Sequence, residues 1–323
     1  MLAATDLRGL YAIIPTPATP DADRGDATET VNLEESARVV NRLIADGVSG
    51  LIALGTMGEC ATLTGDEFET FADCVLRTVD GRVPTFIGTT ALGTHETLQR
   101  MRFVRERGAD GTLLGLPMWQ PCTTEMAVQH YRMVAEAFPD VAIMVYANAR
   151  AFRFDFDAEF WRQVTAQAPT VMSAKYSNAA KLPEMLEAVD GQVNFVPNDD
   201  AAFRFAQVSA RTTTACWAPA LGPRPSIALM NAILAGDMAR AEAIAQDVEW
   251  AGEPVKIVTS SPEIFASYNI QLEKERINAA GYCNAGPVRP PYNVMPAEYV
   301  AAARECGQRW AQLAQKYGGG TTG

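Results

Sequence analysis

Short apolar segments alternate with amphipathic segments along most of this chain, and no other feature constrains its fold as strongly. Each apolar segment is five or six residues long, a length typical of buried strands. In the segments between them, apolar residues recur with the period of a helix. The predicted strands are Tyr11–Pro15, Gly50–Leu54, Pro84–Gly88, Thr112–Leu116, Ala142–Tyr146, Thr170–Lys175, Gln192–Val196 and Thr213–Trp217.

Eight strands that alternate with helices predict an α/β fold of the (β/α)8 or TIM barrel type. The main competitor is a doubly wound open sheet. That alternative is weakened because neither a G-x-G-x-x-G motif nor a P-loop follows any predicted strand. A chain of 323 residues, of which 48% are hydrophobic, has enough apolar material for one large barrel core.

The pattern becomes wholly helical in the last third of the chain. Helices are predicted over residues 224–235, 238–250, 264–280 and 297–316. We therefore predict three parts: a barrel over residues 1–223, a C-terminal helical subdomain packed on the barrel over residues 224–316, and a flexible tail over residues 317–323.

Composition excludes several classes of partner. A formal net charge of −11 argues against nucleic acid and anionic membrane surfaces. No apolar run is long enough to span a membrane, and the two histidines stand in no zinc-binding frame. The six cysteines are scattered, without a C-x-x-C pair, and no signal peptide is recognised at residues 1–10. We therefore expect a reduced, cytoplasmic protein.

Lys175 ends the sixth predicted strand, where lysine is unusual because it is rarely buried. In a poorly solvated site an ammonium group loses proton affinity, and the resulting neutral amine is a nucleophile toward carbonyl carbon. Taken alone, the position also fits a lysine that caps a strand and reaches solvent. Reactive groups of barrel enzymes lie at the C-terminal ends of strands, which is where Lys175 falls.

Three further candidates follow other predicted strands. The turn Gly55-Thr56-Met57-Gly58-Glu59 has two glycines, which allow backbone N–H groups to converge on a small carboxylate. Tyr146 ends the fifth strand, and Trp119 lies just past the fourth. Each also has an ordinary explanation, as a common βα loop or as a packed aromatic.

Together these groups suit a 2-keto acid as the small-molecule substrate. The Lys175 amine can condense with the ketone, and the iminium then acts as an electron sink for making or breaking the bond between carbons 3 and 4. The Tyr146 phenol can carry the protons that these steps require. This chemistry needs no cofactor and no metal.

The chain resembles the dihydrodipicolinate synthase / N-acetylneuraminate lyase family of Schiff-base aldolases. The motifs that carry the resemblance occur in the family's order, and they are Ala12–Pro17, Gly55–Glu59, Gly108–Gly111, Tyr146, Lys175 and Ala285–Pro291. The resemblance implies a barrel that usually assembles as a homotetramer. It also implies that Lys175 forms the imine, that Tyr146 relays protons, and that Thr56 with the Met57 backbone binds the pyruvoyl carboxylate.

Several departures argue against dihydrodipicolinate synthase itself. Met57 replaces a second Thr or Ser, Pro117-Met118-Trp119 replaces Pro-Tyr-Tyr, and Ala151 stands where the synthase has its substrate-binding arginine.

The same departures are similar to one branch of the family, the hydratase-aldolases of bacterial aromatic catabolism, which cleave o-hydroxybenzylidenepyruvate or 2′-carboxybenzalpyruvate. By this resemblance Trp119, Asn148 and Asn269 join the site. An aromatic face on Trp119 suits an aryl substrate, and the two amides suit a hydroxyl at carbon 4.

We therefore expect a hydratase-aldolase that converts an arylidene pyruvate into an aromatic aldehyde and pyruvate. Two alternatives remain: a family member with other chemistry, such as a sugar-acid dehydratase or sialic acid lyase, and a non-catalytic sensor of 2-keto acids. The sequence leaves open which aldehyde is released. It also leaves open whether Arg150 or Arg153 pairs with a substrate carboxylate or is a solvated surface charge.

Overall fold

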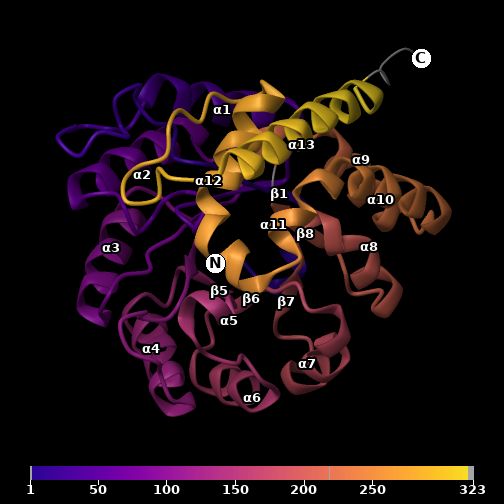
Figure 1. The fold of residues 1–323 in the computed structure, drawn as a ribbon. Coiled ribbons are helices and arrows are strands. Elements are labelled where there is room, and N and C mark those ends of the chain that lie inside the picture. The colour runs from indigo at the N-terminus through magenta and orange to yellow at the C-terminus, as the bar shows by residue number, and fades with distance from the viewer. Residues whose placement is uncertain (1, 218, 319–323) are drawn as a thin grey trace.

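The computed structural model describes residues 2–217 and 219–318, and its centre is a sheet of eight parallel strands in the order β7-β6-β5-β4-β3-β2-β1-β8 (Figure 1). Cys216 N donates to Pro197 O at 2.9 Å, and a parallel bridge joins Asn198 to Cys216, so the two edge strands meet and the barrel is nearly closed. The strands are β1 (Gly9–Ile13), β2 (Gly50–Ala53), β3 (Thr85–Ile87), β4 (Gly111–Leu114), β5 (Ala142–Tyr146), β6 (Val171–Lys175), β7 (Asn194–Val196) and β8 (Thr214–Trp217).

An outer ring of helices surrounds the barrel (Figure 1). Polar caps fix where several of these helices begin. At the start of α2 the Thr64 hydroxyl accepts from Glu67 N, and the Glu67 carboxylate accepts from Thr64 N. At the start of α6 the Asp157 carboxylate accepts from Phe160 N. The ring consists of α1 (Leu33–Ala45), α2 (Gly65–Val79), α3 (Thr94–Glu106), α4 (Thr124–Ala137), α6 (Ala158–Gln167), α7 (Leu182–Val189), α8 (Asp199–Val208) and α9 (Arg224–Leu234).

Of the remaining helices, α10 packs outside the ring against α8 and α9, and the others lie toward one end of the barrel. In Figure 1, α11 and α12 lie across the centre of the ring, and α13 runs over α12. Ser261 caps the start of α12, and Gly281, with a φ of 73°, ends it in the left-handed region. These helices are α5 (Ala149–Phe152), α10 (Met238–Gly252), α11 (Lys256–Thr259), α12 (Pro262–Ala280) and α13 (Ala297–Lys316). Short 3₁₀ turns occur at Ala4–Asp6, Ala179–Lys181, Pro219–Leu221 and Glu253–Val255.

The predicted barrel is confirmed, with small shifts at the ends of elements. The first strand begins at Gly9, two residues before the predicted start, because Gly9 pairs with Thr214 of β8. The short helix α5 was not expected, since four residues are too few to show a helical period. The division between barrel and helical subdomain at residue 224 stays a proposal, and residues 319–323 of the predicted tail lie outside the described residues.

Two further expectations concern the environment of the protein. Within the described ranges, none of the helices has both the length and the hydropathy needed to cross a membrane. All six cysteines are free thiols.

Candidate active site

Tyr146 and Lys175 are the last residues of β5 and β6, and they are partners in the parallel register of the two strands. Lys175 Nζ lies 5.2 Å from the centre of the Tyr146 ring. Just beyond the strands, Ala147 N donates to Lys175 O at 3.2 Å, which keeps the two strand ends together. The structure therefore places the predicted amine and phenol side by side, at the C-terminal end of the barrel.

The Tyr146 hydroxyl is the meeting point of the predicted polar residues. Thr56 Oγ1 lies 3.0 Å from it, and Asn148 Nδ2 donates to it at 3.4 Å. The edge of the Tyr146 ring packs against Phe152, with ring centres 5.6 Å apart and planes at 77°. A phenol held in this way has a fixed orientation and can exchange a proton with the Thr56 hydroxyl, while Asn148 donates a hydrogen bond to it.

The turn that follows β2 presents Thr56 to Tyr146. It begins at Gly55, and the Met57 side chain is buried in the barrel core. A Cβ on Gly58 would lie only 2.8 Å from the backbone nitrogen of Leu54, so the turn closes this tightly only with glycine there. The shape fits the predicted carboxylate cradle, with one hydroxyl from Thr56 directed to the reacting side.

A cavity of about 180 Å³ adjoins Thr56 and Tyr146. Strand ends and loops form one side, and α12 forms the other. Lys175 and Trp119 are not among its described lining residues. Those residues are Leu54, Thr56, Cys60, Ala61, Thr90, Met118, Tyr146, Ala151, Phe152, Ala266, Ser267, Asn269, Ile270, Gln271 and Tyr292.

The two predicted amides reach the site from different parts of the chain. Asn148 caps α5, and its Oδ1 accepts from Ala151 N at 3.2 Å while its Nδ2 faces Tyr146. Asn269 comes from α12 and lines the cavity. Thr56, Tyr146 and Asn269 thus line one cavity, while Asn148 and Lys175 lie next to Tyr146.

Trp119 is 80% exposed, and its neighbour Met118 lines the cavity instead. Arg153 Nη2 donates to the carbonyl oxygens of Met118 and Trp119, at 2.5 and 2.9 Å, so this arginine fixes the loop that carries them. The Arg150 guanidinium lies over the Phe265 ring, 4.9 Å from its centre. The two arginines whose role the sequence left open therefore both have protein partners.

Acidic residues on the other side of Lys175 had no assigned role in the sequence. Burial, and secondarily Asp200, raises the pKa of Asp199 from 3.8 to about 7, and Ser226 Oγ donates to this carboxyl group at 2.5 Å. Burial also raises the pKa of Asp200, opposed by Arg204, Arg276 and Lys175. Glu273, on α12, is fully buried and pairs with Arg276 at 2.9 Å. Asp199 and Asp200 lie just past the end of the seventh predicted strand, after Pro197 and Asn198, and that position was the available signal.

Comparisons with known proteins identify one matching family, similar sequences and a similar structure. The model of the dihydrodipicolinate synthetase family matches residues 11–299. Trans-O-hydroxybenzylidenepyruvate hydratase-aldolase of Pseudomonas aeruginosa is 42% identical over 322 residues, which cover 98% of this chain and 96% of the relative. Trans-2′-carboxybenzalpyruvate hydratase-aldolase of Nocardioides sp. (strain KP7) is 36% identical, with the same coverage. A solved structure, "PhdJ bound to substrate intermediate", superposes with a TM-score of 0.91 at 37% identity and covers 98% of this chain and 99% of that one.

Proposed function

This chain belongs to the dihydrodipicolinate synthetase family, and we infer that it is a hydratase-aldolase: it adds water to an arylidene pyruvate and cleaves the product to an aromatic aldehyde and pyruvate. The enzyme is a carbon–carbon lyase of aromatic degradation. Identity of 42% over nearly the whole length of a hydratase-aldolase is the observation that carries this conclusion.

We propose that Lys175 forms the covalent intermediate. Its neutral amine attacks carbon 2 of the substrate, and loss of the carbonyl oxygen as water leaves an iminium ion. Thr56 and the backbone of the Gly55–Met57 turn hold the substrate carboxylate beside it. Lys175 lies beside Tyr146, whose hydroxyl is 3.0 Å from Thr56 Oγ1, and these two contacts support the assignment.

Conjugation with the iminium makes carbon 4 electrophilic, and a water held by Asn148, Asn269 or Tyr146 adds there and loses one proton. The enamine formed by this addition takes up a proton at carbon 3, which restores the iminium as the electron sink for cleavage. Tyr146 then takes the proton of the new hydroxyl, the bond between carbons 3 and 4 breaks, and the aldehyde leaves. Carbon 3 of the remaining enamine takes up a proton. Water finally hydrolyses the iminium to release pyruvate and restore the amine of Lys175.

We further propose that the preferred aryl group carries a neutral ortho substituent, such as a hydroxyl, and not a carboxylate. The cavity is large enough for an aromatic ring, since roughly 150 Å³ holds benzene. Among the described residues that line it, none carries a charge. An ionised carboxylate placed there would lose its hydration without gaining a cation, because Arg153 already holds two carbonyls and Arg150 lies over Phe265.

Turnover of two substrates tests both proposals. We expect aldehyde release from o-hydroxybenzylidenepyruvate with a higher kcat/KM than from 2′-carboxybenzalpyruvate. A reversed preference would overturn the proposed ortho substituent, and absence of turnover with both would overturn the hydratase-aldolase. Tight pyruvate binding without turnover would instead favour a 2-keto acid sensor.

We propose that the enzyme is a cytoplasmic homotetramer. Six free thiols suit a reducing compartment. Two large apolar side chains on the loops after β3 and β4, Leu92 and Trp119, are 62% and 80% exposed in the single chain and are candidates for a subunit contact. Mass photometry gives the assembly state, and a monomer would contradict this proposal.

A further inference from the structure

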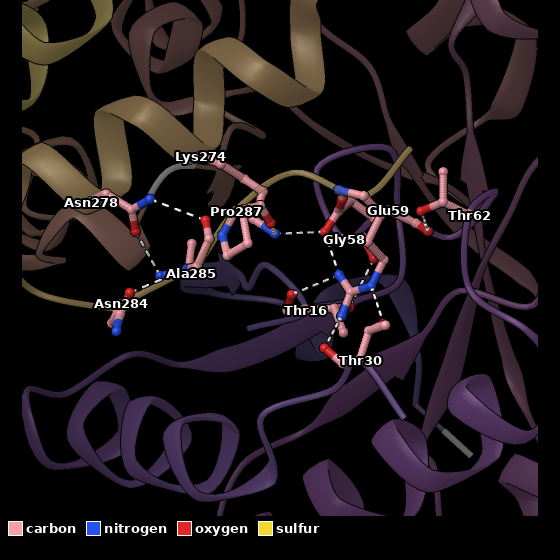
Figure 2. Close-up of polar contacts among 12 residues, drawn as sticks. Thr16, Thr30, Gly58, Glu59, Thr62, Lys274, Asn278, Asn284, Ala285 and Pro287 are labelled. Carbon is pink, nitrogen blue, oxygen red and sulfur yellow. Dashed lines mark hydrogen bonds and ion pairs between the residues drawn. The ribbon is translucent and has the colours of Figure 1, made fainter. Parts of the chain in front are cut away.

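Glu59 ends the Gly55–Glu59 turn and has a buried side chain that contacts two cations from distant parts of the chain. Lys274 Nζ, from α12, lies 2.7 Å from Glu59 Oε2, and Arg289 Nη1 lies 2.5 Å from the same oxygen. Arg289 N donates to Oε1 at 2.8 Å. Figure 2 shows Lys274 reaching from its helix toward both Glu59 and Pro287, whose carbonyl accepts from Nζ at 2.6 Å. We call Glu59, Lys274 and Arg289 the clamp.

The clamp is fully enclosed by protein, which makes each of its charges dependent on the others. The exposed fractions of the Glu59, Lys274 and Arg289 side chains are 0, 1 and 3%. Burial lowers the pKa of Lys274, and the Glu59 carboxylate opposes that shift. Because an unpaired buried charge is far more costly than a paired one, removing the Glu59 carboxylate would leave two cations without their shared partner.

A second carboxylate completes the network through Thr30. Arg289 Nε donates to Thr30 Oγ1 at 2.7 Å, and Thr30 Oγ1 donates to Glu67 at 2.5 Å. Arg289 also donates to the carbonyl oxygens of Thr30 and Thr16. The segment around Arg289 is therefore fixed on the barrel from several directions, and it gives Glu59 a rigid partner.

The backbone of Glu59 is part of the turn that presents Thr56. Glu59 N donates to Thr56 O at 2.9 Å, and Thr16 Oγ1 donates to the carbonyl of Gly58 at 2.7 Å. Glu59 also has a φ of 54°, a left-handed conformation that a non-glycine residue adopts only when its surroundings enforce it. The ion pairs of the side chain therefore act on the same residue whose backbone closes the turn.

The helix that holds Glu59 is also the helix that lines the cavity. Asn269 and Gln271 of α12 face the cavity, and Lys274 follows within about one and a half turns. The ion pair between Glu59 and Lys274 therefore connects the turn to the helix that carries these amides.

We propose that Glu59 is a positioning residue, which through Lys274 and Arg289 holds the Thr56–Met57 turn in register with Asn269. The carboxylate of the keto acid and the oxygen at carbon 4 are then bound at a fixed separation. Glu59 touches no reacting atom, and this inference rests on the proposed function for its kinetic consequences.

Glu59→Gln tests the clamp, because it removes the charge and keeps the size of the side chain. We expect KM for the arylidene pyruvate, and the pyruvate concentration needed for half-maximal borohydride trapping, to rise about 10- to 100-fold, the effect of losing a charged hydrogen bond. Trapping at saturating pyruvate should still reach Lys175. Glu59→Asp, which keeps the charge, should recover part of the loss.

A matched control separates positioning from stability. Val134→Ala removes buried side-chain volume from α4, an outer helix, and should lower the melting temperature without changing KM. If Glu59→Gln melts earlier but keeps the wild-type KM and kcat, the proposal is overturned. If Glu59→Gln does not fold, Lys274→Met serves instead, since it leaves the pair between Glu59 and Arg289 in place.

Hydrogen exchange gives a readout that needs no substrate. We expect the amides of residues 55–60 to lose protection in Glu59→Gln and to keep it in Val134→Ala. Unchanged protection of these amides contradicts the clamp whether or not the enzyme turns over arylidene pyruvates. Absence of turnover by the wild-type protein would contradict only the proposed function.

Discussion

Lys175 and Tyr146 end neighbouring strands at the same level of the barrel, with the amine 5.2 Å from the centre of the phenol ring. A single strand pairing therefore sets the distance between the group that we propose to bond to the substrate and the group that we propose to move its protons. The predictions below follow from this pair and from the residues around it.

Borohydride reduction in the presence of pyruvate should attach the pyruvate adduct to Lys175, because reduction makes the imine permanent. Lys175→Ala should lose both the adduct, seen by mass spectrometry, and the aldolase activity. Lys181→Ala, which removes a half-exposed lysine that only pairs with Asp155, should keep both. Full turnover by Lys175→Ala would show that the mechanism is wrong.

Tyr146→Phe should lower kcat for aldehyde release by about 10²- to 10⁴-fold, the usual contribution of a general acid–base group. The ring still packs on Phe152, so the fold should be retained while the contacts with Thr56 and Asn148 are lost. Tyr282→Phe removes a hydroxyl that donates to Asp46 away from the site and should leave kcat unchanged. Equal kcat values in the two variants would exclude the proton relay.

Asn269→Ala should slow the addition of water more than the cleavage that follows. We expect the rate of aldehyde release to fall about 10- to 100-fold with the arylidene pyruvate, because the variant loses one hydrogen bond to the water that adds. With the hydrated 4-hydroxy intermediate the rate should fall only a few-fold. Asn231→Ala, on the outer helix α9, is the control. An equal loss with both substrates would remove Asn269 from the hydration step.

Trp119→Ala should raise KM for arylidene pyruvates about 2- to 10-fold, as expected for one lost aromatic contact. Since Trp119 is 80% exposed, the free energy of unfolding of the single chain should hardly change. Pyruvate trapping, which involves no aryl group, is the internal control. An unchanged KM for the aryl substrate would mean that Trp119 does not contact it.

Asp199→Asn should stabilise the protein at neutral and alkaline pH. The folded protein raises the pKa of Asp199 from 3.8 to about 7, so it binds this proton more tightly than the unfolded chain does. The stabilisation from the bound proton is complete below about pH 4 and is lost as the pH rises to about 7. The free energy of unfolding measured in urea should therefore be higher in Asp199→Asn than in the wild type, and the difference should grow from about pH 4 to about pH 7. It should reach at most about 4 kcal/mol and then level off. Asp190→Asn, at an exposed position, should show no such trend, and a gain independent of pH would contradict the assignment.

The sequence was sufficient for the barrel because the strands are short runs buried on both faces, whereas the outer helices bury one regular set of residues. Lys175 and Tyr146 could also be predicted as site residues, because the last residue of a barrel strand lies at the C-terminal end of the barrel. The predicted roles of Asn269 and Trp119 came from resemblance, because their positions on a late helix and a loop depend on packing that no local period encodes.

The clamp could not be predicted from the sequence by similar means. The buried residues of α12 include Gln271, Glu273, Lys274 and Arg276, which a reading by hydrophobic period assigns to the solvent side. The burial of Lys274 depends on its ion pair with Glu59, which lies more than 200 residues earlier in the chain. No local sequence pattern predicts that a lysine inside a helix contacts a glutamate that follows a glycine-containing turn.

The position of α12 across the barrel end has a consequence for synthesis of the protein. A nascent chain that has emerged only as far as β8 holds Lys175, Tyr146 and Thr56, and it can already form every strand. It still lacks Asn269, one wall of the cavity and both cations that surround Glu59. Folding on the ribosome can thus begin with the barrel, whereas the proposed site is complete only after α12 and Arg289 have emerged.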